Sequence, residues 1–120
     1  MHDPLDVGDL DKDVARRLTL SRIALAMSQG EFAAKAGLSQ SNYSQYERLW
    51  RSLSIRAAMK LCNAYGLTLD WLYRGDPSGL SIRLYESITE ATREHAQRVI
   101  ADLDAVTSDP TKGRRGSRTS

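Results

Sequence analysis

The sequence of 120 residues contains one cysteine, three prolines and one phenylalanine. A lone cysteine cannot form a disulfide within the chain, so we expect a reducing compartment. Because Cys62 lies in an apolar helical pattern, it is predicted to be a buried, unreactive thiol. The sequence has no CxxC pair, no glycine-rich phosphate loop and no cluster of histidines with carboxylates, and His2 and His95 lie in unrelated segments. It therefore predicts no enzymatic activity, no cofactor and no metal site.

Signals for membranes and export are also missing. No apolar run approaches the roughly 20 residues that are needed to span a bilayer. The first residues, MHDPLDVGDLDKD, lack the basic start and the following apolar run of a signal peptide. We therefore expect a cytoplasmic protein with no membrane partner.

Charge is unevenly distributed, although the net charge at pH 7 is only +2. That small value is a weak argument for a nucleic-acid partner. Residues 1–13 carry five aspartates and are expected to form a flexible acidic segment, which is unsuited to bind phosphates. Residues 108–120 are expected to form a disordered basic tail, either simply solvated or in non-specific contact with nucleic acid. The basic residues of this tail are Lys112, Arg114, Arg115 and Arg118.

Helical patterns dominate, and the only strand-like alternation is a weak one at residues 80–85. Capping residues and apolar spacing predict helices at about residues 14–27, 30–36, 40–48, 55–65, 69–73 and 88–106. Ser28 with Glu31, and Ser87 with Glu90, match the capping box at a helix start. Ser39 and Ser54 are expected to cap the helices at 40–48 and 55–65. We expect an all-α fold, with five helices in a domain at residues 14–75, followed by a linker and a C-terminal helix at residues 76–107.

Two of these helices are predicted to bury particular side chains. In the helix at 55–65, helical spacing predicts an inner face of Ile55, Ala58, Met59, Cys62 and Tyr65. In the short helix at 69–73, Leu69, Leu72 and part of Trp71 are expected to be buried.

Residues 28–48 form the most informative unit, with two capped helices joined by a turn at Gly37. A short turn of this kind makes the helices cross steeply, and the small Ala33 and Ala36 permit close approach. In the second helix we expect Tyr43 and Tyr46 to point inward.

The opposite face of that second helix is neutral and can form hydrogen bonds. Ser41, Ser44, Gln45 and Arg48 follow the i, i+3, i+4, i+7 spacing of one helix face, and Gln40 is exposed in the first turn. Glutamine can pair with both N6 and N7 of adenine, and serine can serve several bases. This face is therefore predicted to read bases.

Three stretches carry a resemblance to a known family: SQGEFAAKAGLS, YSQYE and SIRAAMKLCNAYGLTLDWLYRG. In register and without a gap, they are similar to the helix-turn-helix domain of phage repressors, Cro proteins and their bacterial relatives, the Xre family. The resemblance covers about residues 16–75. It implies a lambda-repressor-like fold in a bacterial or phage-encoded regulator, most often a repressor. Such a protein binds double-stranded DNA at a pseudo-palindromic operator as a homodimer.

The resemblance also implies roles for individual residues. Six residues match positions that contact bases or lie at the edge of the groove in the family: Ser39, Gln40, Ser41, Asn42, Ser44 and Gln45. Matching phosphate-contacting positions are Arg22, Ser28, Gln29, Arg48 and Arg51. Arg22 and Glu47 match an ion pair that ties the first helix to the recognition helix in some members; the alternative for Glu47 is a solvated acid.

The sequence departs from the family at two places. Relatives usually have Asn-Gly after the glutamate, where this chain has Arg48 and Leu49, and they usually have glycine where Ala26 stands. Losing the first glycine removes a residue suited to a left-handed backbone. Trp50, which follows, either packs on the core, which we favour, or makes an exposed contact with DNA or a partner.

The first helix also carries a second apolar face, formed by Leu20 and Ile23. We expect residues 80–106 to cover it, either within the chain or from a second subunit. The candidate residues for dimerisation or docking are Leu20, Ile23, Leu84, Ile88, Val99 and Leu103. Two alternatives remain open: a final helix that merely extends the core, and an antitoxin or adaptor whose residues 80–106 bind a partner protein while DNA binding is secondary.

Overall fold

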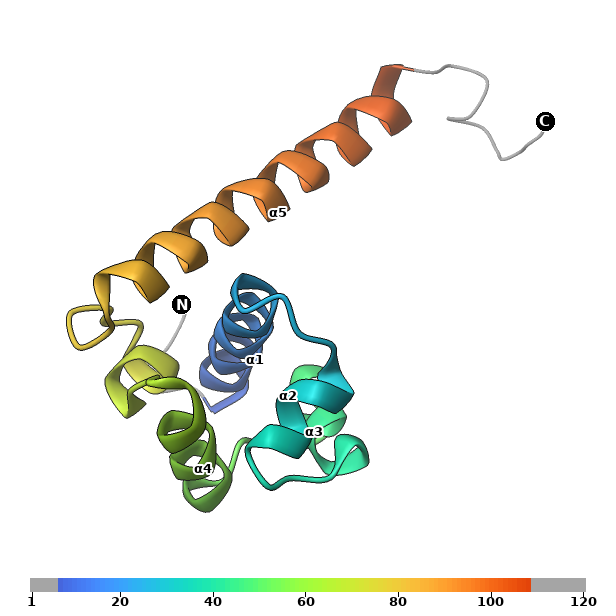
Figure 1. Ribbon diagram of the computed structural model, residues 1–120. Helices are drawn as coiled ribbons and strands as arrows, with labels where there is room; N and C mark the ends of the chain where they lie inside the picture. Colours follow the sequence, from blue (N-terminus) through green and yellow to red (C-terminus); the bar gives the residue numbers. More distant parts are fainter. Residues whose placement is uncertain (1–6, 109–120) are drawn as a thin grey trace.

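The computed structural model describes residues 7–108, and every regular element in that range is helical (Figure 1). The elements are α1 (Val7–Ala24), α2 (Gln29–Lys35), α3 (Gln40–Glu47), α4 (Ile55–Tyr65), the single π-helical turn η1 (Asp70–Arg74) and α5 (Ile82–Ser108). The first five form a bundle in which α1 packs against α3 and η1, and α5 packs on α1. This confirms the prediction of an all-α, five-helix domain with a C-terminal helix.

Serine side chains begin three of the helices, as the sequence predicts. At α2, the Ser28 hydroxyl accepts the Glu31 N–H at 3.1 Å, and the Glu31 carboxylate accepts the Ser28 N–H at 3.0 Å. The hydroxyls of Ser39 and Ser54 accept backbone N–H groups in the first turns of α3 and α4. Each cap satisfies a backbone donor that has no partner inside the helix.

The first helix begins earlier than the sequence indicates. α1 starts at Val7 instead of residue 14, so the expectation of a flexible acidic segment over residues 1–13 is wrong for residues 7–13. The acidic residues there are compatible with a helix because Asp9 lies in the first turn, where a negative charge is favourable. In addition, the Asp11 carboxylate accepts the Ser52 hydroxyl at 2.7 Å. Residues 1–6 lie outside the described range.

The last helix also begins earlier than predicted. Ser81 caps it by accepting the Leu84 N–H at 3.1 Å, so Ser87 lies inside α5 and does not cap it. The weak strand-like pattern at residues 80–85 does not mark a strand, because α5 begins at Ile82. The physical reason is that Leu84 and Ile88, four residues apart, both pack into the core only if the helix includes them. The predicted basic tail lies outside the described residues, apart from Ser108 at the end of α5.

The core centres on the aromatic side chains of α2, α3 and α4. The Phe32 ring stacks on Tyr65 with a centroid distance of 4.4 Å and meets Tyr43 edge to face at 5.3 Å. Ala33 and Ala36 are buried beside Phe32, which confirms that small residues let α2 approach its neighbours. The core therefore fixes α3 against α2.

The predicted inner face of α4 is partly wrong. Ile55 and Met59 are more than half exposed, and the buried residues of this helix are Ala57, Ala58 and Leu61. Leu69 is also exposed, whereas Leu72 is buried as predicted. The inner face of α4 is thus rotated toward its alanines, because small residues allow a closer helix contact than Ile and Met.

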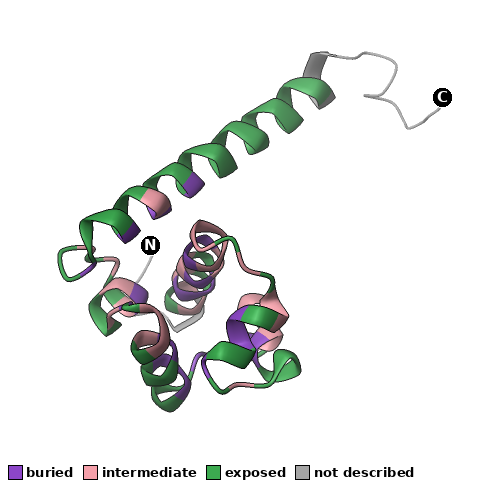
Figure 2. Ribbon diagram, in the orientation of Figure 1, coloured by how far each residue is buried: buried purple, intermediate pink, exposed green. Residues whose placement is uncertain are grey.

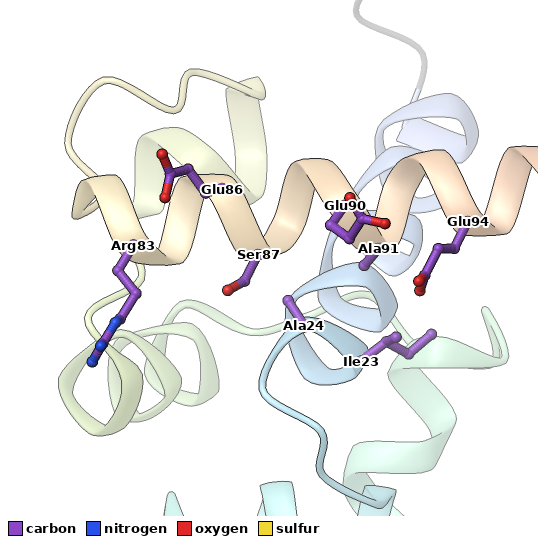
Figure 3. A pocket seen from close by; sticks show the side chains of 8 residues that line it. All are labelled: Ile23, Ala24, Arg83, Glu86, Ser87, Glu90, Ala91 and Glu94. Carbon is purple, nitrogen blue, oxygen red and sulfur yellow. The ribbon is translucent and has the colours of Figure 1, made fainter.

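Helix α5 covers α1 at its start and then leaves the domain. Leu84, Ile88 and Ala91 are buried, whereas every side chain described from residue 92 to 105 is exposed (Figure 2). At the contact, Ala91 and Ser87 of α5 face Ile23 and Ala24 of α1 around a pocket of about 370 Å³ (Figure 3). The second apolar face of α1 is therefore covered within the chain. Within residues 7–108, no helix is long and apolar enough to cross a membrane.

Candidate nucleic-acid interface

Helix α3 is anchored by its two tyrosines. Tyr43 is fully buried and Tyr46 nearly so, which confirms that both point inward. Their rings meet edge to face at a centroid distance of 6.5 Å. An eight-residue helix is marginal on its own, so this packing is what holds α3 in place.

An ion pair ties α3 to α1. The Arg22 Nε donates to Glu47 Oε2 at 2.8 Å, and its Nη2 donates to Oε1 at 3.1 Å. The third guanidinium nitrogen, Nη1, donates to the Met27 carbonyl at 3.0 Å. Only 16% of the Arg22 side chain and 7% of the Glu47 side chain are exposed. Glu47 is therefore a buried structural partner, and its reading as a solvated acid is wrong.

Two further side chains converge on Glu47. The Tyr43 hydroxyl donates to Oε2, and the Gln29 amide donates to Oε1 at 3.0 Å. The carboxylate thus joins α1, α2 and α3. The sequence indicated only the arginine partner, although the spacing of Tyr43 and Glu47, four residues apart on one helix, was a visible signal for the tyrosine.

The same contacts shift the ionisation of the group. Burial alone would raise the pKa of Glu47, but the hydrogen bonds from Arg22, Tyr43 and Gln29 outweigh it and lower that pKa. The hydrogen bond to Glu47 raises the pKa of Arg22, and burial raises the pKa of Tyr43. At neutral pH the pair is therefore charged, and the phenol is protonated.

The opposite face of α3 is directed to solvent. Gln40, Ser41 and Asn42 are exposed, whereas Ser44 and Gln45 are half-buried. The Ser44 hydroxyl donates to the Ser41 carbonyl at 3.1 Å. Ser39 is exposed too, although its hydroxyl oxygen is used in the cap. The residues predicted to read bases thus lie together on and beside one short helix.

A glycine of α2 lies directly beside the first of these residues. A Cβ atom placed on Gly30 would come within 3.0 Å of the Gln40 Oε1 atom. The absence of a side chain at this position lets the Gln40 amide lie against the first turn of α2. This contact could not be predicted from the sequence, because it depends on how closely α2 and α3 cross.

The residues predicted to contact phosphate fall into two groups. Arg48 and Arg51 are exposed just after α3. Arg22 and Gln29, in contrast, are bonded to Glu47, while Ser28 is exposed and caps α2. The structure therefore brings all five near α3 but gives Arg22 and Gln29 an internal role as well.

The loop after α3 follows the path that glycine provides in relatives. Leu49 adopts a left-handed φ of 65°, and the Trp50 N–H donates to the Gln45 carbonyl at 2.9 Å to close the helix end. Ala26, the other departure, has a φ of 57°. Both positions keep the backbone of a glycine although their residues carry side chains.

Trp50 lies on the surface, so the favoured prediction that it packs on the core is wrong. Trp50 is 68% exposed, and the Arg48 guanidinium lies 5.1 Å from the centroid of its ring. Arg51 lies over the Tyr46 ring at 5.9 Å. The left-handed turn at Leu49 directs the indole away from the core, which the sequence could not show.

The helix-turn-helix family model matches residues 18–72. This range begins at Leu18 within α1 and ends at Leu72 within η1. This segment is a helix-turn-helix domain of the Xre type. No curated protein and no solved structure significantly matches the chain. The fold and this match support a DNA-binding regulator of the Xre type.

Other kinds of site are not evident in this regulator. Among residues 7–108, no three side chains of His, Cys, Asp or Glu are grouped so that they could hold a metal ion. Cys62 is half-buried, and burial raises the pKa of its thiol. A thiol of raised pKa is a poor nucleophile at neutral pH.

Proposed function

We propose that this protein is a sequence-specific transcriptional repressor that binds double-stranded DNA with α3 in the major groove. The observation that carries the proposal is the division of α3 into two faces. Tyr43, Tyr46 and Glu47 hold the helix rigidly from inside, while amides and hydroxyls face outward without an acid among them. A rigid, neutral helix face of this kind can enter the groove and offer donors and acceptors to base edges.

Base reading is assigned to the outward residues of α3. Gln40 is the main reader, because its amide is exposed and positioned against Gly30. Bidentate pairing of such an amide with adenine discriminates against a wrong base by about 1–3 kcal/mol. The supporting contacts are assigned to Ser39, Ser41, Asn42, Ser44 and Gln45.

Phosphate binding is assigned first to Arg48 and Arg51, which are exposed at the end of α3. Ser28 and Gln29, at the start of α2, match family positions that contact phosphate. Arg22 contributes mainly through Glu47, because its guanidinium nitrogens already have protein partners. Each phosphate that is neutralised adds about 0.9 to the slope of log affinity against log salt concentration.

A homodimer is the assembly that the proposal requires, and the outer half of α5 is its interface. Val99, Ile100 and Leu103 are about half exposed on one side of this helix. At its inner end, Trp71 and Leu80 help to line an apolar groove that reaches Ala96 on the same helix. A ridge and a groove on one element can each be filled by the other across a two-fold axis, so the fitting occupant is a second copy of the chain.

Antiparallel pairing at Ala96 brings the two features together. Leu103 and Thr89 each lie seven residues from Ala96, or about 10 Å at the rise of an α-helix. Pairing centred there places Leu103 of each copy beside Thr89 in the groove of the other. Two bound domains would then read half-sites about 34 Å apart on a pseudo-palindrome.

The exposed half of α5 also supports a second candidate, an antitoxin or adaptor that binds another protein there. The observation in its favour is that this half projects away from the DNA-binding domain (Figure 1). Purification of the tagged protein from its native host would separate the two: a stoichiometric foreign chain that is lost on Leu103→Glu substitution would favour the adaptor. For the regulator, we place the protein in the cytoplasm of a bacterium, encoded by the cell or by a phage.

Selection from a pool of random duplexes tests the proposed function. The purified protein should enrich one inverted repeat with half-sites about one helical turn apart. A matched selection with Gln40→Ala should lose the preference at one or two positions in each half-site. Enrichment of no sequence above the starting pool would contradict the proposal.

A further inference from the structure

We propose that the indole of Trp50 packs against the sugar–phosphate backbone of DNA beside α3, so that the regulator grips its site with an aromatic side chain as well as with arginines. This inference rests on the proposed function and concerns a residue for which the resemblance implies no role. Its starting point is an exposed tryptophan three residues after the end of the recognition helix.

The location of Trp50 favours DNA as the occupant. α3 ends at Glu47, Arg48 caps it, and the Trp50 N–H is bonded back to Gln45 on the same helix. The backbone of Trp50 is therefore held at the C-terminal end of α3, and its indole starts from there. The major groove is about 12 Å wide, so a side chain just past the end of a helix inside it meets the groove wall, which is the sugar–phosphate backbone.

The charges around Trp50 also fit a polyanion. Arg48 lies over its ring at 5.1 Å, and Arg51 follows it in the chain. Residues 48–54 include no acid, and of the acids beside them Glu47 is bonded to Arg22 and Asp11 to the Ser52 hydroxyl. An exposed aromatic ring with an arginine over one face can present its other face to deoxyribose and its N–H group to a phosphate oxygen, while Arg48 and Arg51 bind neighbouring phosphates.

The fold itself gains little from this arrangement. A large apolar side chain that is 68% exposed makes few core contacts. Leu49 holds a left-handed φ of 65°, a backbone conformation that is unfavourable for an L-residue. A strained backbone at Leu49 and an exposed side chain at Trp50, both beside the proposed binding surface, are expected if these residues contact a ligand.

The test measures affinity for the duplex selected above and for a duplex of random sequence. Trp50→Ala should weaken both by about tenfold, since sugar and phosphate are common to all sequences and a buried aromatic contact is of this order. Its salt slope should equal that of the parent, because the indole is uncharged. Arg48→Ala should instead reduce the slope by about 0.9. Trp50→Phe, which keeps a ring, should restore most of the affinity.

Fluorescence gives a second reading. In a Trp71→Phe background, emission comes from Trp50 alone, since the chain has two tryptophans. Binding of either duplex should then quench or shift this emission.

Three outcomes would overturn the inference while leaving the proposed function intact. These are Trp50→Ala binding within twofold of the parent, unchanged Trp50 emission on binding, and a change in oligomeric state on Trp50→Ala, which would assign the indole to a second copy. Failure of the parent to prefer any duplex would instead overturn the proposed function itself.

Discussion

At the scale of single residues, Glu47 links α1 and α2 to α3. Its carboxylate accepts hydrogen bonds from Arg22, Gln29 and Tyr43, which come from three different helices. Removing the carboxylate would leave the Arg22 guanidinium buried without its counter-charge. The orientation of α3 therefore depends on this one carboxylate.

Substitution of Glu47 by glutamine should destabilise the domain by about 3 kcal/mol, because the Arg22 guanidinium stays buried without its counter-charge. Urea unfolding followed by circular dichroism would measure this loss. The matched control is Glu90→Gln, which removes an exposed ion pair with Arg93 on α5 and should change stability by less than about 0.5 kcal/mol. Equal effects of the two substitutions would contradict the assigned role of Glu47.

The lowered pKa of Glu47 predicts a dependence on pH. In the unfolded chain a glutamate has a pKa of about 4.3, and in the folded domain it is lower, so the unfolded state takes up the proton first as pH falls. The contribution of Glu47 is thus fully present above about pH 5 and is lost as the pH falls through the folded pKa. The stability difference between the parent and Glu47→Gln should shrink below pH 5. A stability difference between the two proteins that stays constant down to pH 3 would contradict the lowered pKa of Glu47.

Much of this network could be predicted from the sequence. The pairing of Arg22 with Glu47 followed from the family pattern, and the inward direction of Tyr43 followed from helical spacing. The bond from Gln29 could not be predicted, because it depends on the approach of α2 to α3. The surface position of Trp50 was also missed, since a left-handed backbone at Leu49 is unusual for an L-residue.

At the scale of elements, the crossing of α2 and α3 positions the outward face of α3, which is proposed to read bases. At the surface of this crossing, a Cβ atom placed on Gly30 would lie only 3.0 Å from the Gln40 Oε1 atom. Because the Gln40 side chain is flexible and exposed, a methyl group at position 30 can displace it without disturbing the core. A single substitution at Gly30 should therefore change DNA recognition without lowering stability.

Gly30→Ala should leave the melting temperature unchanged or raise it, because alanine favours a helix over glycine. It should also weaken binding to the selected duplex by about tenfold, as expected when one bidentate base contact is lost. Thermal unfolding and fluorescence anisotropy measure the two effects. Ala34→Ser, on the exposed side of the same helix, is the control and should change neither. Parent-like affinity in Gly30→Ala would show that Gln40 is not held by this contact.

The boundaries of the elements show where local signals are insufficient. The caps at Ser28, Ser39 and Ser54 were predicted, because a cap is set by residues within four positions of each other. The starts of α1 and α5 were placed too late. Their first turns are stabilised by distant contacts, such as that of Asp11 with Ser52 and the burial of Leu84.

At the scale of the whole molecule, the exposed outer half of α5 is the proposed dimer interface. The proposed antiparallel dimer buries Val99 and Leu103, so Val99→Glu with Leu103→Glu should make the protein monomeric in sedimentation equilibrium. Gln97→Glu with Ala101→Glu, on the opposite side of the same helix, is the control and should remain dimeric. Equal masses for the two double variants would contradict this interface.

The central claim is that the outward residues of α3 read the DNA sequence. The most direct measurement is an anisotropy titration of the selected duplex and a scrambled duplex with the parent, Gln40→Ala and Gln97→Ala, an exposed glutamine of α5. We expect Gln40→Ala to lose about tenfold or more in affinity for the selected duplex only, while Gln97→Ala binds like the parent. If Gln40→Ala binds the selected duplex as tightly as the parent, or weakens both duplexes equally, α3 does not read bases as proposed.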